Sequence, residues 1–304
     1  MPFTQHIAPS LKWRILISGF SNTGKTTSLL TFIYGPHDPD SPDENERAEA
    51  IEYAANKHMV ILTCPGEFGT RSLPQSNDHI TSYSYTAPEG DDVTSVTWSQ
   101  HALQEFYALS TQVIKEKPDI LVIDGLHCLW EQRMNVITDG DYLRGVDLNI
   151  NVRTGNVDPY RSAKFHEQAH NSFGQYLAAL NLCSVPVVIG TTWEDWKSVK
   201  ADGEKVGDIS ATRYLWPDIP GKMATRIVGK WDARLSARLE KRCFHDSCTY
   251  SKNNVEHHVW QVLPKNDVQG VGIKGLRKIP VKLKEKPWIH QDASVLWKLI
   301  AACT

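Results

Sequence analysis

Eight consecutive residues, from Gly19 to Thr26, constrain this chain more than any other part of it. They read Gly-Phe-Ser-Asn-Thr-Gly-Lys-Thr and fill every fixed position of the pattern G-x-x-x-x-G-K-[ST]. Residues 13–18 before the pattern have the apolar character of a short buried strand, and residues 26–34 have the pattern of an apolar helix. A strand, this loop and a helix in succession predict a phosphate-binding loop rather than a chance glycine-rich turn.

The residue types of the loop define its chemistry. The two glycines allow backbone N–H groups to surround a phosphate at the start of the following helix. Lys25 is expected to reach the β- and γ-phosphates of a nucleotide, and the Thr26 hydroxyl is expected to be a ligand of Mg²⁺. We therefore predict that ATP and Mg²⁺ are bound here. The predicted nucleotide-binding residues are Gly19, Ser21, Asn22, Thr23, Gly24, Lys25, Thr26 and Thr27.

Composition is that of a soluble globular protein. Of the 304 residues, 41% are hydrophobic and 22% are charged, which allows a substantial core. No apolar stretch is long enough to span a membrane, and residues 1–6 lack the layout of a signal peptide. Six scattered cysteines fit reduced thiols better than a disulfide framework. We therefore expect a cytoplasmic protein with no membrane partner, while the net charge of −2 argues neither for nor against nucleic acid.

Short apolar segments alternate with helical patterns along most of the chain. Strands are expected at 58–64, 80–85, 119–124 and 185–192, and helices at 45–57, 96–117 and 162–182. This alternation is typical of a parallel sheet with helices on both faces. The polar segment 131–160 is either a functional loop or a mobile excursion.

The pattern changes near residue 226. Two runs, 238–244 and 257–263, flank a polar tip and predict a β-hairpin, and residues 293–303 are expected to form a short amphipathic helix. We therefore divide the chain into a core, 1–240, and a C-terminal extension of hairpin and helix, 241–304, packed on that core.

Possible zinc ligands cluster in this extension. They are Cys243, His245, Cys248, His257 and His258. Their spacing matches no standard zinc finger, so an exposed hairpin with free thiols is favoured over a bound zinc ion.

Two acidic residues follow predicted strands, at the edge where ligands gather in an open α/β sheet. Asp124 ends one strand and is expected to hold Mg²⁺ together with Thr26. In many ATPases with an extra sheet strand a glutamate follows this aspartate directly, but here the next residue is Gly125. We predict that Glu67, just past another strand, polarises the attacking water; the alternative is a solvated acid in a turn.

A phosphate loop, a glutamate after the second strand and an aspartate-terminated strand without an adjacent glutamate resemble the arrangement of RecA-like ATPases. More closely, the chain resembles phage-encoded nucleotide-binding proteins of that core, which include single-strand-annealing relatives of recombinases. The resemblance reaches to about residue 240 and is carried by residues 16–30, 60–69, 119–129, 185–193 and 220–232. It implies a RecA-like P-loop NTPase fold, with a mostly parallel central sheet flanked by helices and the C-terminal hairpin added to it.

The resemblance also implies partners and further site residues. It implies a homo-oligomer assembled head to tail, with the nucleotide at or near a subunit interface, and binding to single-stranded DNA. Thr191 or Thr192 would sense the γ-phosphate, and Lys230, Arg234 or Arg238 would reach the nucleotide of a neighbouring subunit. The expected catalytic residues are thus Lys25, Glu67, Asp124 and Thr191.

Tryptophans and basic residues near the end of the core allow a second interpretation of that region. They are Trp193, Trp196, Trp216 and Trp231, with Arg213, Lys222, Arg226 and Lys230. Such a set can form a stacking surface for single-stranded nucleic acid. Tryptophans in this number are more often packing anchors, in the core or in subunit contacts.

The predicted function is Mg²⁺-dependent ATP hydrolysis in phage-type DNA metabolism: recombination or annealing, helicase loading, or packaging. A small-molecule kinase is one alternative, but kinases enclose the phosphates with an arginine-rich lid, and segment 131–160 holds only three widely spaced arginines. A non-hydrolysing, nucleotide-gated interaction module is the other.

Overall fold

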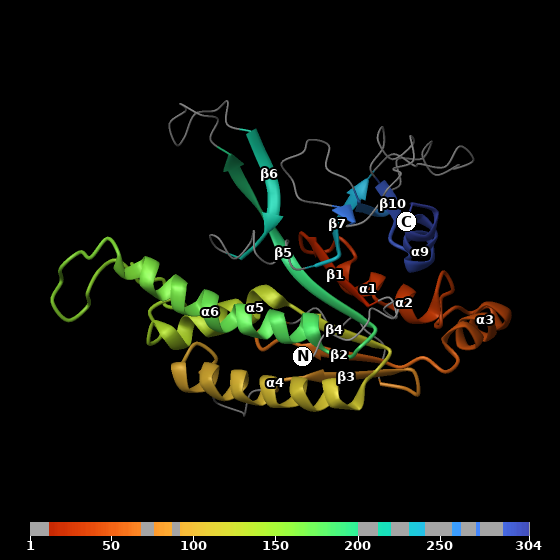
Figure 1. Cartoon of the computed structure of the whole chain (residues 1–304), viewed down its shortest axis with the longest axis horizontal. Helices are drawn as coiled ribbons and strands as arrows, with labels where there is room; N and C mark the ends of the chain where they lie inside the picture. The colour runs from red at the N-terminus through yellow and green to blue at the C-terminus, as the bar shows by residue number, and fades with distance from the viewer. Residues whose placement is uncertain are drawn as a thin grey trace, which may run out of the picture.

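A mostly parallel sheet with helices on both faces forms the centre of the computed structural model (Figure 1). The structure describes residues 12–67, 76–86, 92–199, 212–219, 231–240, 257–262, 272–273 and 288–303. The strand order is β10-β8-β7-β1-β5-β4-β2-β3, with β6 paired to β5 and β9 paired to β7. From β7 to β3 all neighbours are parallel. The chain is thus an α/β protein whose described C-terminal strands are antiparallel additions.

The strands are short except for β5. Their bounds are β1 (Trp13–Gly19), β2 (Met59–Thr63), β3 (Ile80–Ser84), β4 (Ile120–Asp124), β5 (Val187–Val199), β6 (Thr212–Pro217), β7 (Ala233–Glu240), β8 (His257–Gln261), β9 (Gly272–Ile273) and β10 (Trp288–His290). Strand β5 runs beyond the other strands and pairs there with β6 as a two-stranded arm (Figure 1).

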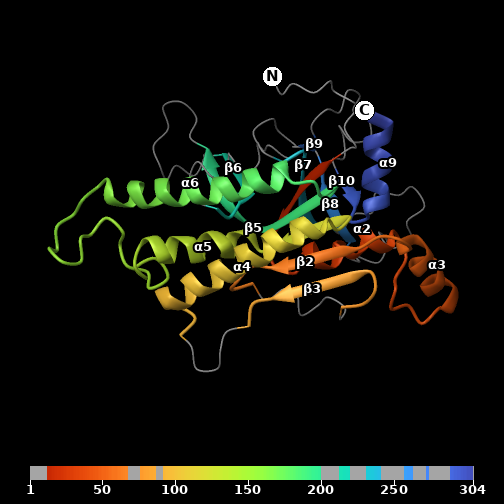
Figure 2. The ribbon, with the colours of Figure 1, turned by 60° about the horizontal axis from the view of Figure 1, so that its bottom comes forward.

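Helices cover the two faces of the sheet as separate layers (Figure 2). One layer contains α1 (Lys25–Ser28), α2 (Leu30–Tyr34), α3 (Glu44–Ala54) and α9 (Ala293–Cys303). The other contains α4 (Val96–Glu116), α5 (Leu126–Ile137) and α6 (Arg161–Leu182). In this second layer α5 lies between α4 and α6 and contacts both.

The period of two along each strand divides the apolar residues between two hydrophobic cores. In β1, Ile15 and Ile17 pack against the layer of α2 and α9, whereas Leu16 packs against the layer of α5 and α6. In β4, Val122 and Ile123 divide in the same way. Because both faces are covered, these strands are apolar on both sides, as in parallel sheets generally.

Most of the expected elements are confirmed, and several differ. Strand β7 pairs antiparallel with β8, as the hairpin prediction requires, but β7 begins at Ala233 and not at 238. The rest of the predicted first strand and the polar tip lie outside the described residues, and α9 has the expected bounds. Segment 131–160 is not one long loop, because α5 continues to Ile137. Strands β6, β9 and β10 were not expected, and the helix after the phosphate loop is interrupted at Leu29.

The C-terminal strands continue the main sheet. Strand β8 adds to β7, and β10 adds to β8.

Among the helices of the described residues, none combines the length and the apolar character needed to cross a membrane.

Candidate functional site

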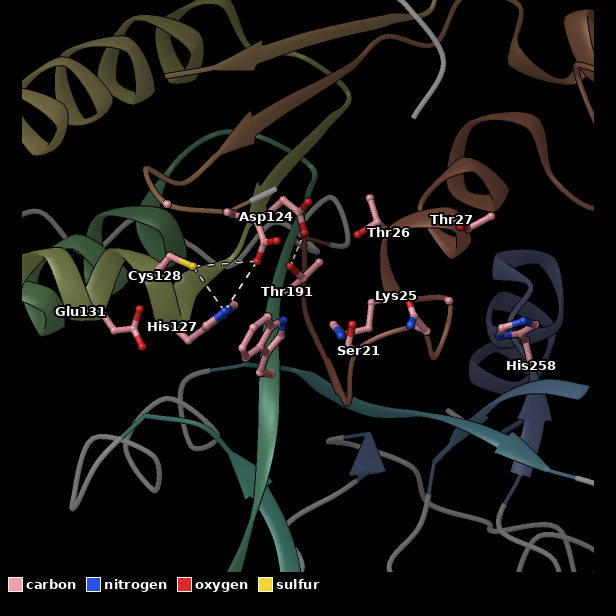
Figure 3. A pocket seen from close by; sticks show the side chains of 15 residues that line it. Ser21, Lys25, Thr26, Thr27, Asp124, His127, Cys128, Glu131, Thr191 and His258 are labelled. Atoms are coloured by element: carbon pink, nitrogen blue, oxygen red, sulfur yellow. Dashed lines mark hydrogen bonds and ion pairs between the residues drawn. The ribbon is translucent and has the colours of Figure 1, made fainter. Parts of the chain in front are cut away.

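A pocket of about 660 Å³ opens where β1, β2 and β4 end and β5 continues past them (Figure 3). Its size is that of typical small-molecule sites. The residues that line it are Ser21, Asn22, Gly24, Lys25, Thr26, Thr27, Gly66, Glu67, Asp124, His127, Cys128, Glu131, Thr191, Trp193 and His258. All four predicted catalytic residues therefore share one pocket.

Strand pairing explains this convergence. Strand β5 lies between β1 and β4, so the strand that leads into the glycine loop and the strand that ends in Asp124 are separated by one strand. Ile123 is in register with Gly190 on one side of β5, and Gly19 is in register with Trp193 on the other. The ends of β1 and β4, with the middle of β5 between them, thus bring a lysine, an aspartate and a threonine together.

The glycine loop forms one wall. Lys25 Nζ donates hydrogen bonds to the carbonyl oxygens of Gly19, at 3.0 Å, and Phe20, at 2.7 Å. Burial lowers the pKa of Lys25, while the Coulombic effect of Asp124 opposes this. Thr23 is buried and donates its hydroxyl proton to the Phe20 carbonyl, so it supports the loop, and neither it nor Gly19 lines the pocket.

Asp124 is held by a threonine on the neighbouring strand. The Thr191 hydroxyl donates a hydrogen bond to Asp124 Oδ1 and accepts one from the Gly125 N–H, at 2.9 Å. Burial raises the pKa of Asp124 to about 6, and the hydrogen bond from Thr191 opposes that rise. Thr192, the other candidate sensor, is fully buried and does not line the pocket. In this structure Thr191 positions the end of β4.

Glu67 reaches the pocket from a tight turn after β2. The Glu67 N–H donates to the Cys64 carbonyl at 3.0 Å, and Gly66 between them has a φ of +94°, which favours glycine. Only 12% of the Glu67 side chain is exposed. Glu67, the predicted base, therefore lies at the pocket wall. It is not the solvent-exposed turn residue of the alternative interpretation.

Two neighbours of Glu67 were not singled out in the sequence. His127 Nε2 lies 3.6 Å from Glu67 Oε2, and Cys128 Sγ lies 3.3 Å from His127 Nε2 (Figure 3). The His127 ring stacks on Trp193, with 4.5 Å between ring centroids. Burial lowers the pKa of His127 to about 3 and raises the pKa of the Cys128 thiol, so both are neutral at pH 7. The sequence did place both residues in the first turn after Asp124, and this position could have indicated that they lie near the pocket.

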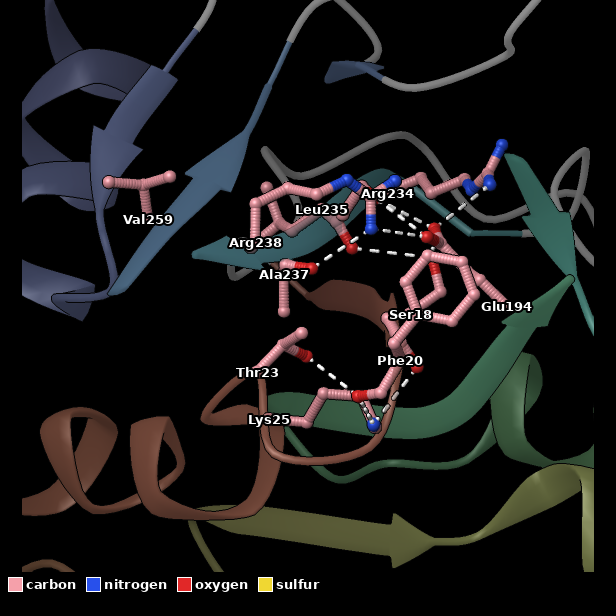
Figure 4. Close-up of polar contacts among 12 residues, drawn as sticks. Ser18, Phe20, Thr23, Lys25, Glu194, Arg234, Leu235, Ala237, Arg238 and Val259 are labelled. Carbon is pink, nitrogen blue, oxygen red and sulfur yellow. Dashed lines mark hydrogen bonds and ion pairs between the residues drawn. The ribbon is translucent and has the colours of Figure 1, made fainter. Parts of the chain in front are cut away.

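The resemblance implies that Arg234 or Arg238 reaches the nucleotide of a neighbouring subunit. In the structure both side chains instead point into the molecule, toward Glu194 (Figure 4). Glu194, whose side chain is fully buried, lies 3.4 Å from Arg234 Nη2 and 2.6 Å from Arg238 Nη1. Burial lowers the pKa of Arg234 to about 10, and Glu194 opposes this. Arg238 also lies over the Phe20 ring, so this ion cluster contacts the base of the glycine loop. Lys230 lies outside the described residues.

The C-terminal extension contacts the loop from its other side. Gln291 Nε2 donates to the carbonyl oxygens of Thr23, at 2.7 Å, and Val259, at 3.1 Å. A Cβ on Gly24 would lie 2.5 Å from Gln291 Oε1 and 2.7 Å from His258 Nδ1. Position 24 therefore favours glycine for two reasons: its φ is +83°, and a side chain there would contact Gln291 and His258.

The tryptophans divide between surface and core. Trp193 is 45% exposed at the pocket, whereas Trp231 is 3% exposed and packs in the core. The side chains of Trp196, Trp216 and Arg213 lie outside the description, as do Lys222 and Arg226. The candidate zinc ligands Cys243, His245 and Cys248 also lie outside it.

No protein-family model matches the chain, and no curated protein matches it. Among solved structures, the chain is similar to the flagellar accessory protein FlaH from Methanocaldococcus jannaschii, with a TM-score of 0.34 and 10% identity over 82% of this chain and 78% of that one. A likeness at this level carries no conclusion about function, and the fold of this chain is defined by its own strand order and pairing.

Proposed function

We propose that this chain is a Mg²⁺-dependent ATPase with a RecA-like core. One observation carries the proposal: Lys25, Asp124 and Glu67 come from three separate segments and line the same pocket. A phosphate-binding lysine, a metal-binding acid and a second acid are the groups that hydrolysis of a nucleoside triphosphate requires. The extra strand β5 between the loop strand and the Asp124 strand is consistent with this class of ATPase.

The site residues fit a magnesium ion. Asp124 Oδ2 is buried and has no hydrogen-bond partner among the described residues, which leaves a carboxylate oxygen free to bind a cation. Thr26 lines the same pocket and supplies a hydroxyl oxygen (Figure 3). Oxygen ligands of this kind are those that Mg²⁺ prefers. When bound, the ion would neutralise charge on the phosphates, while Thr26 and Asp124 would hold it.

The roles of the protein side chains follow from their positions. Lys25 would exchange its hydrogen bonds to the loop carbonyls for phosphate oxygens, because charged phosphate is the stronger acceptor. Glu67 would accept a proton from the attacking water, a contribution of about 10²–10⁴ in rate for a positioned base. Thr191 would keep Asp124 oriented through its hydroxyl.

The proposal extends to phage-type DNA metabolism, with stimulation by single-stranded DNA and assembly into a homo-oligomer. This part is supported only by the resemblance of the motif set to RecA-like phage proteins. Trp193 is the exposed aromatic residue of the described site at which stacking of a base can be tested.

The arginines of segment 131–160 do not favour the kinase alternative. Arg133 Nε donates to Ser172 Oγ at 2.8 Å, and Arg144 donates to carbonyl oxygens of its own turn. Among the described residues that line the pocket there is no arginine. The described part of the pocket wall thus offers none of the arginines that a kinase lid uses to enclose phosphates.

Release of phosphate from ATP tests the proposal. We expect hydrolysis with Mg²⁺, loss of activity when EDTA removes the metal, and stimulation by single-stranded DNA that weakens as salt is raised. Turnover that is indifferent to DNA would contradict the DNA-metabolism part alone. Absence of turnover with and without DNA, together with tight ATP binding, would contradict the ATPase and favour the nucleotide-gated module.

A further inference from the structure

Three side chains beside the pocket have the composition and the spacing of a zinc site. Cys128 Sγ lies 3.3 Å from His127 Nε2 and 3.9 Å from Glu67 Oε2, and the histidine and glutamate atoms are 3.6 Å apart. Zinc bonds of about 2.0–2.3 Å place the ligands of a tetrahedral ion about 3.3–3.8 Å from one another. The three atoms therefore already stand close to one face of such a tetrahedron.

We propose that Glu67, His127 and Cys128 bind a zinc ion, with water or a nucleotide oxygen as the fourth ligand. We further propose that this ion inhibits hydrolysis by occupying Glu67, a consequence that rests on the proposed function. Zinc binding forms a Zn–S bond and releases the Cys128 thiol proton to the solvent, so no oxidant or reductant is required.

The donor set separates this site from the magnesium site. A thiolate and an imidazole are ligands that zinc prefers, and magnesium is bound by oxygen ligands. Thr26 and Asp124 offer oxygen atoms only, whereas the cluster offers sulfur, nitrogen and oxygen. The same pocket thus presents two donor sets of different ion preference.

Local structure holds the three ligands in place. His127 and Cys128 lie in the first turn of α5, and Glu67 comes from the turn after β2. The His127 ring, 2% exposed, is stacked on Trp193, which limits its rotation. The Cys128 thiol donates to Glu67 Oε2 at 3.9 Å, and His127 Nε2 lies 3.6 Å from the same oxygen; an entering ion would replace these two contacts with bonds to itself.

Zinc binding is measured first without nucleotide, by competition with a chromogenic chelator. The background is Cys243→Ser/Cys248→Ser, which removes the other candidate thiol ligands in the sequence. We expect one equivalent of zinc in this background. Adding Cys128→Ala should weaken binding by more than about 100-fold, because losing even an outer-shell partner of a metal costs 10–100-fold. His127→Gln should do the same, which guards against misfolding of one variant.

A cysteine outside the pocket is the matched control. Cys183 is buried, and its thiol donates to the Leu180 carbonyl at 3.1 Å, a bond that serine can keep. Cys183→Ser should therefore retain the equivalent of zinc. Cobalt should give a thiolate charge-transfer band in the background chain and in Cys183→Ser, and not in Cys128→Ala. Equal zinc affinity with and without Cys128 would overturn the site.

Inhibition is measured as the ratio of hydrolysis rates with and without zinc, within each variant at saturating Mg²⁺. We expect a ratio of about one tenth or less in the background chain and close to one after Cys128→Ala. Zinc that binds the cluster without slowing hydrolysis would overturn the inhibition. A chain that hydrolyses no ATP even without zinc would contradict the proposed function, and the chelator titration would still decide the site.

Discussion

A Cβ atom on Gly125 would lie 2.7 Å from Cβ of Glu67 and 2.8 Å from its Cγ. Contacts under 3.0 Å are essentially never seen for a real Cβ, so a side chain at position 125 and Glu67 in its present place exclude each other. A glutamate at position 125 of this chain would therefore require Glu67 to move. In this chain the glycine makes room for an acid that arrives from the next strand.

Gly125→Ala should therefore displace Glu67. We expect hydrolysis to fall about tenfold or more, while ATP affinity changes little because the glycine loop is untouched. The matched control is Gly145→Ala, since Gly145 also has a positive φ, +70°, but a Cβ there meets nothing within 4 Å. Both variants carry a left-handed backbone cost of about 1–2 kcal/mol. Equal hydrolysis by the two variants would show that the contact with Glu67 is irrelevant.

Thr191→Val should weaken both the fold and the activity. The change keeps the shape of the side chain but leaves the Gly125 N–H and Asp124 Oδ1 without the hydroxyl between them. Unpaired buried polar groups cost about 1–3 kcal/mol each, so urea denaturation should show a loss of that order. Thr191→Ser, which keeps the hydroxyl, should recover most of the stability and the hydrolysis. A valine variant as stable and active as the wild type would contradict this role.

Lys25→Ala should reduce ATP affinity by more than about tenfold, because a charge-assisted contact with phosphate is worth about 1.5–3 kcal/mol. Equilibrium binding of a fluorescent ATP analogue measures it. Lys57→Ala is the control: Lys57 lies over the Tyr53 ring, 3.7 Å from its centroid, and does not line the pocket. If both variants bind ATP as the wild type does, the glycine loop is not the phosphate site.

Glu194→Gln should destabilise the protein by about 3–5 kcal/mol, since it leaves the Arg234 and Arg238 guanidinium groups buried beside a neutral amide. The free energy of unfolding in urea is the measurement. Glu49→Gln removes the carboxylate of an exposed pair with His37 and should cost less than about 1 kcal/mol. Similar losses in the two variants would mean that the buried cluster does not support the loop.

Local sequence predicts those features that depend only on adjacent residues along the chain. The glycine loop, strand β4 ending in Asp124 and helix α9 are recognisable from spacing alone, because a loop motif or an apolar period fixes each of them. Glu67 was predicted from its place after a strand, and the structure brings it to the pocket with Lys25 and Asp124.

The residues that sequence reasoning missed depend on contacts between distant segments. Gln291 follows the loop by more than 260 residues, yet donates to the Thr23 carbonyl. Arg234 and Arg238 look like exposed basic residues in the sequence, and only the pairing of β7 beside β1 shows that they meet Glu194. Such contacts follow from sheet order, which local patterns do not specify.

Single-turnover hydrolysis of Mg²⁺–ATP by Glu67→Gln, beside its nucleotide affinity, tests the central claim most directly. If Glu67 is the base, the amide should keep ATP affinity within about threefold of wild type and slow the chemical step by about 10² or more. Hydrolysis by Glu67→Gln at the wild-type rate would contradict the account and remove Glu67 from the catalytic residues.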